Sequence, residues 1–145
     1  ALIPALHDED KSVVMKCIFV LGQIGDERAI PALIGLLGSE DVDIEGVLVQ
    51  VLEGFGESAL PYLIEAVSHE HWRVREQSVS ILGQIGDSSA VPVLITALND
   101  AHWGVRFEAI QALAGIDKKR LKQVIQPLQN DPDSRVQALA NKLMK

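Results

Sequence analysis

Apolar residues along this chain recur with the spacing of a helix, and the pattern returns after about 30 residues. Between residues 74 and 85 the inward positions are Val74, Ser78, Ile81, Leu82 and Ile85, whereas a strand would need a period of two. The same register gives Val13, Cys17, Val20, Leu21 and Ile24; Ile44, Leu48, Val51, Leu52 and Phe55; and Val105, Ala109, Ala112, Leu113 and Ile116. The pattern therefore predicts helices throughout.

The helices form a repeated unit with two helical patterns in each copy. The approximate bounds of the copies are 1–25, 26–56, 57–86, 87–117 and 118–145. Two short helices cannot bury their own apolar faces, but units stacked side by side bury a continuous core. We therefore expect residues 1–145 to form a single all-α domain of stacked units.

Glycine and proline mark the turns between these helices. Gly25, Gly56 and Gly86 suit the left-handed residue that ends a helix. Pro31, Pro61 and Pro92 follow near the start of the next helix, where each can lie in the first turn or bend a helix that begins earlier. The sequence leaves both possibilities open.

Two long stretches make the repeat specific: "VREQSVSILGQIGDSSAVPVLITAL" and "VMKCIFVLGQIGDERAIPALIGLL". Their Leu-Gly pair, Gly-Asp turn and Ala-Val/Ile-Pro ending resemble HEAT repeats of the short kind first noted in phycobilisome lyases. The resemblance covers nearly all of residues 1–143. It implies a right-handed α-solenoid of about four and a half units of 30–31 residues, with the second helix of each unit on the concave side. Because the shared motif is a packing motif, it implies the fold more than the function.

The two ends of the chain differ from the central units. Residues 1–6 align with residues 32–37, so the chain starts inside a first helix, and we expect it to be a fragment of a longer chain. The last unit carries Pro127 late in its first helix and has a polar second helix, as expected of an end cap.

Between the core positions, the second helices carry a stripe of residues that does not repeat from unit to unit. Four of the six aromatic residues fall on it. The candidate partner-binding residues are Met15, Phe19, Trp72, Arg73, Glu76, Gln77, Trp103 and Phe107. Aromatic side chains anchor many protein interfaces. The alternative is local packing, in which each tryptophan folds over its helix start and covers the preceding turn.

Composition limits the classes of partner that we expect and indicates a cellular compartment. The net charge of −7 argues against nucleic acid, which is bound largely by Lys and Arg, and disfavours anionic membranes. No uninterrupted apolar run approaches the ~18 residues that span a bilayer. The single cysteine, Cys17, rules out an internal disulfide and favours a reducing compartment. We expect a cytoplasmic protein.

Catalytic and metal sites find little support in the sequence. His69, His71 and His102 lie at polar turns, and neighbouring helices ~8–10 Å apart do not bring two of them to one zinc ion at ~2 Å each. Cys17 falls in a core column. We expect no metal and no cofactor, and we expect Asp26 and Asp87 to pair with Arg75 and Arg106 between units.

One HEAT-repeat enzyme family, the deoxyhypusine hydroxylases, holds di-iron between His-Glu pairs. The matching positions here read Lys16-Cys17, Val47-Leu48, Gln77-Ser78 and Glu108-Ala109. That chemistry is therefore not expected. The sequence favours a non-enzymatic scaffold that binds a protein partner on the second helices. The alternative, implied by the resemblance, is a phycobilin lyase-like subunit that handles a linear tetrapyrrole on an antenna protein.

Overall fold

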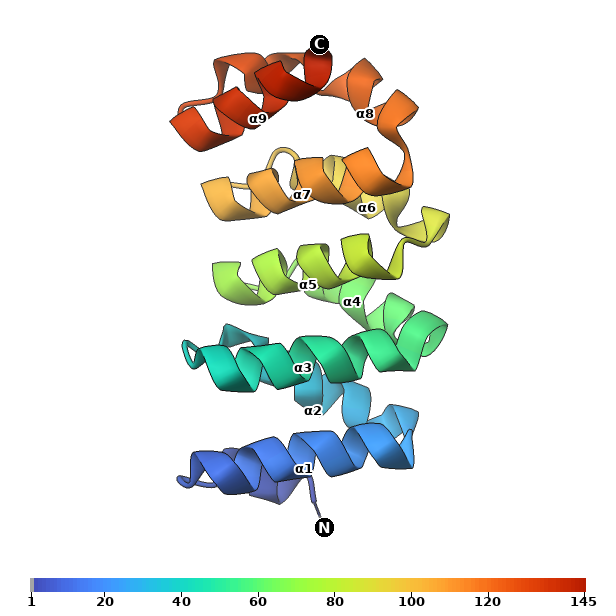
Figure 1. The fold of residues 1–145 in the computed structure, drawn as a ribbon, viewed down its shortest axis with the longest axis vertical. Helices are drawn as coiled ribbons and strands as arrows, with labels where there is room; N and C mark the ends of the chain where they lie inside the picture. The colour runs from blue at the N-terminus through green and yellow to red at the C-terminus, as the bar shows by residue number, and fades with distance from the viewer. Residues whose placement is uncertain (1) are drawn as a thin grey trace.

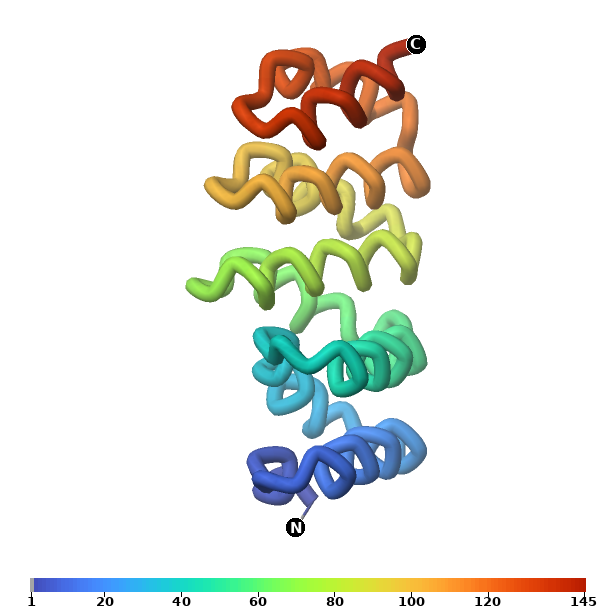
Figure 2. The backbone as a smooth tube through the Cα atoms, turned by 60° about the vertical axis from the view of Figure 1, so that its left-hand side comes forward, coloured from blue at the N-terminus to red at the C-terminus, as the bar shows by residue number. Residues whose placement is uncertain are grey.

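A computed structural model describes residues 2–145 as a stack of helices, with the N- and C-termini at opposite ends (Figure 1). One layer holds the second helices of the units: α1 (Lys11–Ile24), α3 (Val42–Phe55), α5 (Trp72–Ile85), α7 (Trp103–Ile116) and α9 (Ser134–Met144). The other layer holds the first helices: α2 (Ile30–Gly35), α4 (Leu60–Ala66), α6 (Val91–Ala97) and α8 (Lys118–Val124). The all-α solenoid expected from the sequence is confirmed, and Figure 2 shows the same ascending order of units from another side.

Short 3₁₀ turns complete the units: η1 (Pro4–His7), η2 (Glu27–Ala29), η3 (Leu36–Gly38), η4 (Gly56–Ala59), η5 (Ser88–Ala90) and η6 (Gln126–Asn130). The prolines at 31, 61 and 92 lie in the first turns of α2, α4 and α6, each after one of these 3₁₀ turns. This settles the choice that the sequence left open. Gly25 and Gly86 end α1 and α5 in the left-handed conformation, with φ of 70° and 75°.

Each turn before a second helix carries two hydrogen-bond acceptor side chains, two residues apart. Each of them accepts the backbone N–H of the residue two positions further on. The first set is Asp8, Ser39, His69, Asp100 and Asp131. The second set, the N-caps, is Asp10, Asp41, His71, His102 and Asp133. His71 and His102 accept through Nδ1, at 3.2 and 3.0 Å. His71 and His102 are therefore the N-caps of α5 and α7, and His69 accepts a hydrogen bond within the turn before α5.

The core runs through the stack as columns of equivalent residues. Cys17, Leu48, Ser78, Ala109 and Ala140 are all buried, as the register predicts. Val20 and Ile24 depart from that prediction, because 37% and 60% of their surfaces are exposed. Val20 lines an open hollow between α1 and α3, and Ile24 is the last residue of α1.

Close contact between second helices requires small residues. A Cβ added to Gly83 of α5 would lie 2.7 Å from Cβ and 3.0 Å from Cα of Ala112 on α7. A Cβ on Gly22 of α1 would lie 2.8 Å from a methyl group of Val51 on α3. The glycines therefore set how closely α1 approaches α3 and how closely α5 approaches α7.

Arginine–aspartate pairs join the last three units. Arg75 donates two hydrogen bonds to Asp100, at 2.8 and 3.1 Å, and Arg106 donates two to Asp131, both at 2.8 Å. Arg106 also donates to the backbone carbonyl of Asp100 at 2.8 Å, so the pairs form one continuous chain. The expected partners were wrong. The carboxylate of Asp26 accepts from Arg28, and that of Asp87 accepts from the backbone N–H of Ser89, because both aspartates cap their own turns.

One helical stretch of the described residues, the 25-residue Val42–Ala66, is long and apolar enough to cross a membrane, judged by length and composition alone. The stretch is not straight, because it comprises α3, η4 and α4 and turns at Gly56, where φ is 55° and ψ is −128°. Its Leu48, Leu52 and Leu63 have no exposed surface. Packing between units therefore accounts for part of its apolar character, since 28% of its most apolar window is buried.

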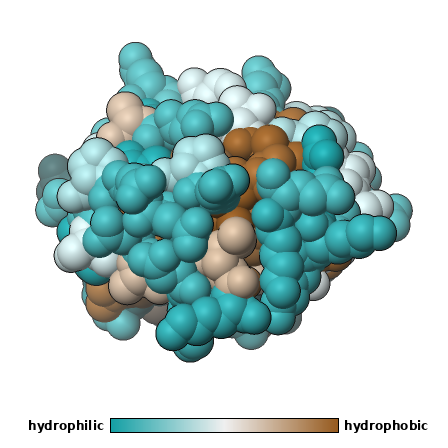
Figure 3. All heavy atoms as spheres, turned by 90° about the horizontal axis from the view of Figure 1, so that it is seen from above, coloured by the Kyte–Doolittle hydropathy of each residue, from teal (hydrophilic) through white to brown (hydrophobic). Residues whose placement is uncertain are grey.

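The end of the stack formed by the last unit is largely hydrophilic, as the view down the long axis shows (Figure 3). Asn141 on α9 is exposed, whereas Ile18, Val79 and Ile110 at the equivalent positions have no exposed surface. A polar residue therefore replaces the apolar residue that meets the next unit elsewhere in the stack.

We expect Gly83→Ala to lower the free energy of unfolding by about 1–3 kcal/mol, because the new methyl group overlaps the backbone of Ala112. Gly46→Ala is the matched control in α3, since nothing lies within 4 Å of its added Cβ. It should raise stability by about 0.5–1 kcal/mol through helix propensity. Urea unfolding of both variants checks this, and equal stabilisation by the two would contradict close packing at Gly83.

We expect Arg106→Leu to destabilise the fold by about 3 kcal/mol, because it leaves the carboxylate of Asp131 unpaired. The two side chains are only 12% and 3% exposed. Arg28→Leu breaks a similar pair whose side chains are 89% and 36% exposed, and should change stability by less than about 1 kcal/mol. Equal losses of stability in the two variants would rule out a special role for the buried pair.

Candidate functional site

The structure places the eight candidate binding residues on the second helices, in two separate groups. Met15 and Phe19 lie on α1, and the other six lie on α5 and α7. The groups differ in chemistry, since the first borders an apolar hollow and the second combines aromatic, basic and acidic side chains. The candidate residues therefore share the layer of second helices, but they form two separate regions within it.

The apolar hollow lies between α1 and α3 and has a volume of about 400 Å³. Its lining residues are Met15, Lys16, Phe19, Val20, Val47 and Gln50. Phe19 is 53% exposed, a large fraction for an aromatic side chain. Val47 was not among the eight candidate residues. Its signal was an apolar residue at a position that carries Lys16, Gln77 and Glu108 in other units.

The two tryptophans belong to a stack of rings that connects the last three units. The ring of Trp72 stacks on that of His102, with centroids 3.9 Å apart and planes 7° apart. The guanidinium carbon of Arg135 lies 3.4 Å from the ring centroid of Trp103. Trp103 also meets Phe107 edge to face, with centroids 6.3 Å apart. Each tryptophan thus covers the helix start of the following unit, so local packing engages both rings.

Arg73 and Gln77 tie α5 to α3 through Glu45. Arg73 donates to a carboxylate oxygen of Glu45 at 2.6 Å and to the backbone carbonyl of Ser39 at 2.9 Å. Gln77 donates to the other oxygen of Glu45 at 2.9 Å. Glu45 stands where the later units carry the arginines of the Arg–Asp chain. At the junction of α3 and α5, Glu45 therefore takes the place of an Arg–Asp pair. Its contacts use two of the candidate residues, Arg73 and Gln77.

Two partly buried glutamates lie beside each other on the same face. Burial raises the pKa of Glu76 on α5, and the nearby His102 and Arg73 partly offset that shift. Burial also raises the pKa of Glu108 on α7, and the negative charge of Glu76 adds to that shift. Glu108 was not among the eight candidates, because a charged residue on an exposed stripe looks ordinary in sequence.

Glu108 also lines a second, polar hollow between α5 and α7, with a volume of about 240 Å³. The lining residues are Ser80, Gly83, Gln84, Glu108, Gln111 and Ala112. Four of these side chains can form hydrogen bonds, and the other two residues, Gly83 and Ala112, have little or no side chain. This hollow differs from the one between α1 and α3 in both size and polarity.

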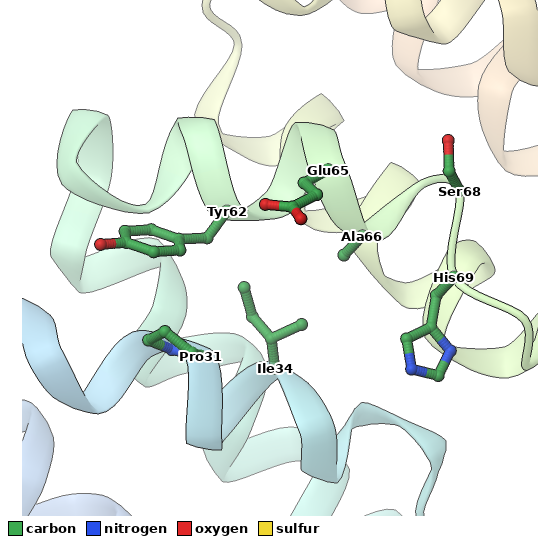
Figure 4. Close-up of a pocket in the computed structure, with 7 residues that line it drawn as sticks. All are labelled: Pro31, Ile34, Tyr62, Glu65, Ala66, Ser68 and His69. Atoms are coloured by element: carbon green, nitrogen blue, oxygen red, sulfur yellow. The ribbon is translucent and has the colours of Figure 1, made fainter.

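A third hollow, of about 420 Å³, lies on the first helices between α2 and α4. Figure 4 shows the ring of Tyr62 above Pro31, with Ile34 pointing up between the two helices. The hydroxyl of Ser68 points away from the imidazole of His69, and Nδ1 of His69 accepts the backbone N–H of His71. The adjacent serine and histidine therefore do not form a nucleophile–base pair.

Within residues 2–145, no group of three or more His, Cys, Asp or Glu side chains is placed to hold a metal ion. Cys17 is buried in the core column, where a thiol acts as a small apolar side chain.

Solved structures of other proteins share this architecture. A structure of the complex of CpcE and CpcF of phycocyanin lyase from Nostoc sp. PCC7120 matches with 25% identity and a TM-score of 0.65, covering 99% of this chain. This chain spans only 62% of that one. A crescerin structure, from work on a TOG domain array that regulates microtubules in the primary cilium, matches with 19% identity and a TM-score of 0.69, covering 99% and 71% of the two chains.

A designed armadillo repeat protein in complex with the peptide (KR)4 matches with 18% identity and a TM-score of 0.57, covering 99% of this chain and 80% of that one. No curated protein sequence is a significant match to this chain. The family model for HEAT repeats matches residues 1–53, 38–114 and 60–145. Since these matches together span the whole sequence, the chain belongs to the HEAT-repeat family.

Proposed function

We propose that this chain is a non-enzymatic scaffold that holds a segment of a partner protein against its second helices. The observation that carries the proposal is the apolar hollow between α1 and α3, where Phe19 and Val20 are 53% and 37% exposed. Exposed apolar side chains gathered around a hollow are typical of protein interaction sites. The equivalent positions of Phe19 in later units are Gln50, Ser80 and Gln111, so stacking does not require an aromatic residue there.

Two structural neighbours support a polypeptide as the partner. One is a complex of two proteins, CpcE and CpcF, and the other is a designed repeat protein bound to a peptide. In the proposed complex, an apolar residue of the partner fills the hollow and contacts Phe19, Met15 and Val47. Burial of apolar area in this way is the main source of affinity at the centre of an interface.

We expect Phe19→Ala to weaken partner binding by at least about tenfold, because it removes the largest apolar wall of the hollow. Peptides selected from a random display library on the unchanged chain provide the ligands, and fluorescence anisotropy gives their affinities. Tyr62→Ala is the matched control, since Tyr62 is also exposed but lies on the first helices. Circular dichroism should show unchanged helicity in both variants.

Tyr62→Ala should alter the affinities less than twofold. Loss of binding in Tyr62→Ala with no effect of Phe19→Ala would move the binding site to the first helices. Failure to select any peptide whose binding depends on Phe19 would contradict the scaffold proposal for this face.

The likeness to phycocyanin lyase favours a second candidate, a lyase-like subunit that handles a linear tetrapyrrole. In that case the aromatic ring of Phe19 would stack on the pigment in the apolar hollow. Titration with biliverdin should then shift its visible absorption band, and Phe19→Ala should abolish the shift. An unchanged spectrum, or a shift that persists in Phe19→Ala, would exclude this use of the hollow.

A further inference from the structure

The polar hollow between α5 and α7 has walls suited to a cationic side chain. Glu108 contributes a carboxylate, Gln84 and Gln111 contribute amide oxygens, and Ser80 contributes a hydroxyl. Gly83 and Ala112, which pack closely against each other, also line the hollow. Lysine and arginine carry only donors at their charged ends, and these groups supply acceptors.

No Lys or Arg of residues 2–145 forms an ion pair with Glu76 or Glu108. The nearest arginine of the same face, Arg73, is held by Glu45 and Ser39. Ser80 lies close enough to Glu108 to lower its pKa, and the carboxylate of Glu76 lies against Gly104, whose added Cβ would be 3.0 Å away. Neither carboxylate therefore has a Lys or Arg ion-pair partner within residues 2–145, although the nearby Arg73 and His102 lower the pKa of Glu76.

We infer that the polar hollow between α5 and α7 receives a lysine or arginine side chain from the same partner segment whose apolar residue enters the hollow between α1 and α3. The inference rests on the proposed function and specifies the chemistry of the partner. Two observations carry it. One hollow on this face is apolar and the other is polar, and the polar one is lined by the carboxylate of Glu108.

The positions of the two hollows set the spacing within the partner. The line from the α1–α3 hollow to the α5–α7 hollow covers two steps between neighbouring second helices. Packed helices lie ~8–10 Å apart, which gives a separation of roughly 16–20 Å. An extended chain advances ~3.3 Å per residue, so the apolar and basic residues should be about five or six positions apart.

The charge distribution of the chain favours such a partner. The net charge is −7, and more than half of the Lys and Arg residues lie in the last unit, after residue 117. Residues 1–117 thus carry an excess of acidic groups, which attracts a basic segment from a distance, although α1, α3, α5 and α7 themselves carry as many Lys and Arg as Asp and Glu. A bound cation would also lower the raised pKa values of Glu76 and Glu108, because it stabilises their charged forms.

The test is a random-peptide display selection on the unchanged chain and, in parallel, on a Glu76→Gln, Glu108→Gln double variant. Glutamine keeps the shape of the side chain and removes only the charge. Peptides from the unchanged chain should be enriched in Lys or Arg about five or six positions from a bulky apolar residue. Their affinity for the double variant should fall at least about tenfold, the usual effect of losing a hydrogen-bonded charge.

Glu65→Gln serves as the matched control, because Glu65 lines the hollow on the first helices. It should leave the affinities within about twofold of the unchanged chain. Peptides that depend on Phe19 but show no basic enrichment, or bind the double variant equally well, would overturn the inference and leave the scaffold proposal standing. Absence of any Phe19-dependent peptide would instead overturn the scaffold proposal, and with it this inference.

The pH dependence of peptide binding provides a second readout. Only the ionised carboxylates attract a cation, and their pKa values in the free chain are raised. Affinity should therefore be highest at neutral pH and should fall as the pH drops through those raised pKa values. The double variant should show no such fall, and an equal pH dependence in both chains would contradict the inference.

Discussion

The close contact between neighbouring second helices is the constraint on which the rest of the structure depends. A single unit has too few residues to enclose its own apolar side chains, so each unit is stable only against its neighbours. The helices approach so closely that a side chain at Gly83 would overlap Ala112, and one at Gly22 would overlap Val51. This contact buries the core columns, and it also brings side chains of successive units close enough to form the hollows of the second-helix face.

Polar and aromatic contacts then fix how each unit sits on the next. Arg106 joins Asp100 and Asp131, and the ring of Trp72 stacks on His102, which itself caps α7. Such contacts are directional, whereas apolar burial is not, so they add a definite register to the stack. Several residues that look like recognition residues in the sequence, among them Arg73, Gln77 and both tryptophans, make these junctions.

Under the proposed function, the residues available for recognition are those that the junctions do not use. Phe19 and Val47 border a hollow that stacking leaves open, and Glu76 and Glu108 keep negative charges that no Lys or Arg of residues 2–145 pairs with. Burial raises the pKa values of both glutamates, so their ionised forms are less favourable in the fold than in water. Retaining such groups opposes stability, which is common where a surface is used for binding.

The sequence alone determined the helices, the length of the repeat and the core columns, because these depend on the period of apolar residues and on local turn chemistry. Cys17 and Ser78 were placed in the core from register alone, and both are buried. Only the tertiary structure decided which charged groups meet, since Arg75 and Arg106 reach Asp100 and Asp131 across units rather than Asp26 and Asp87. It also separated the candidate residues into an apolar hollow, a ring stack and a pair of glutamates. Those groupings depend on distances between units, which the order of residues along the chain does not specify.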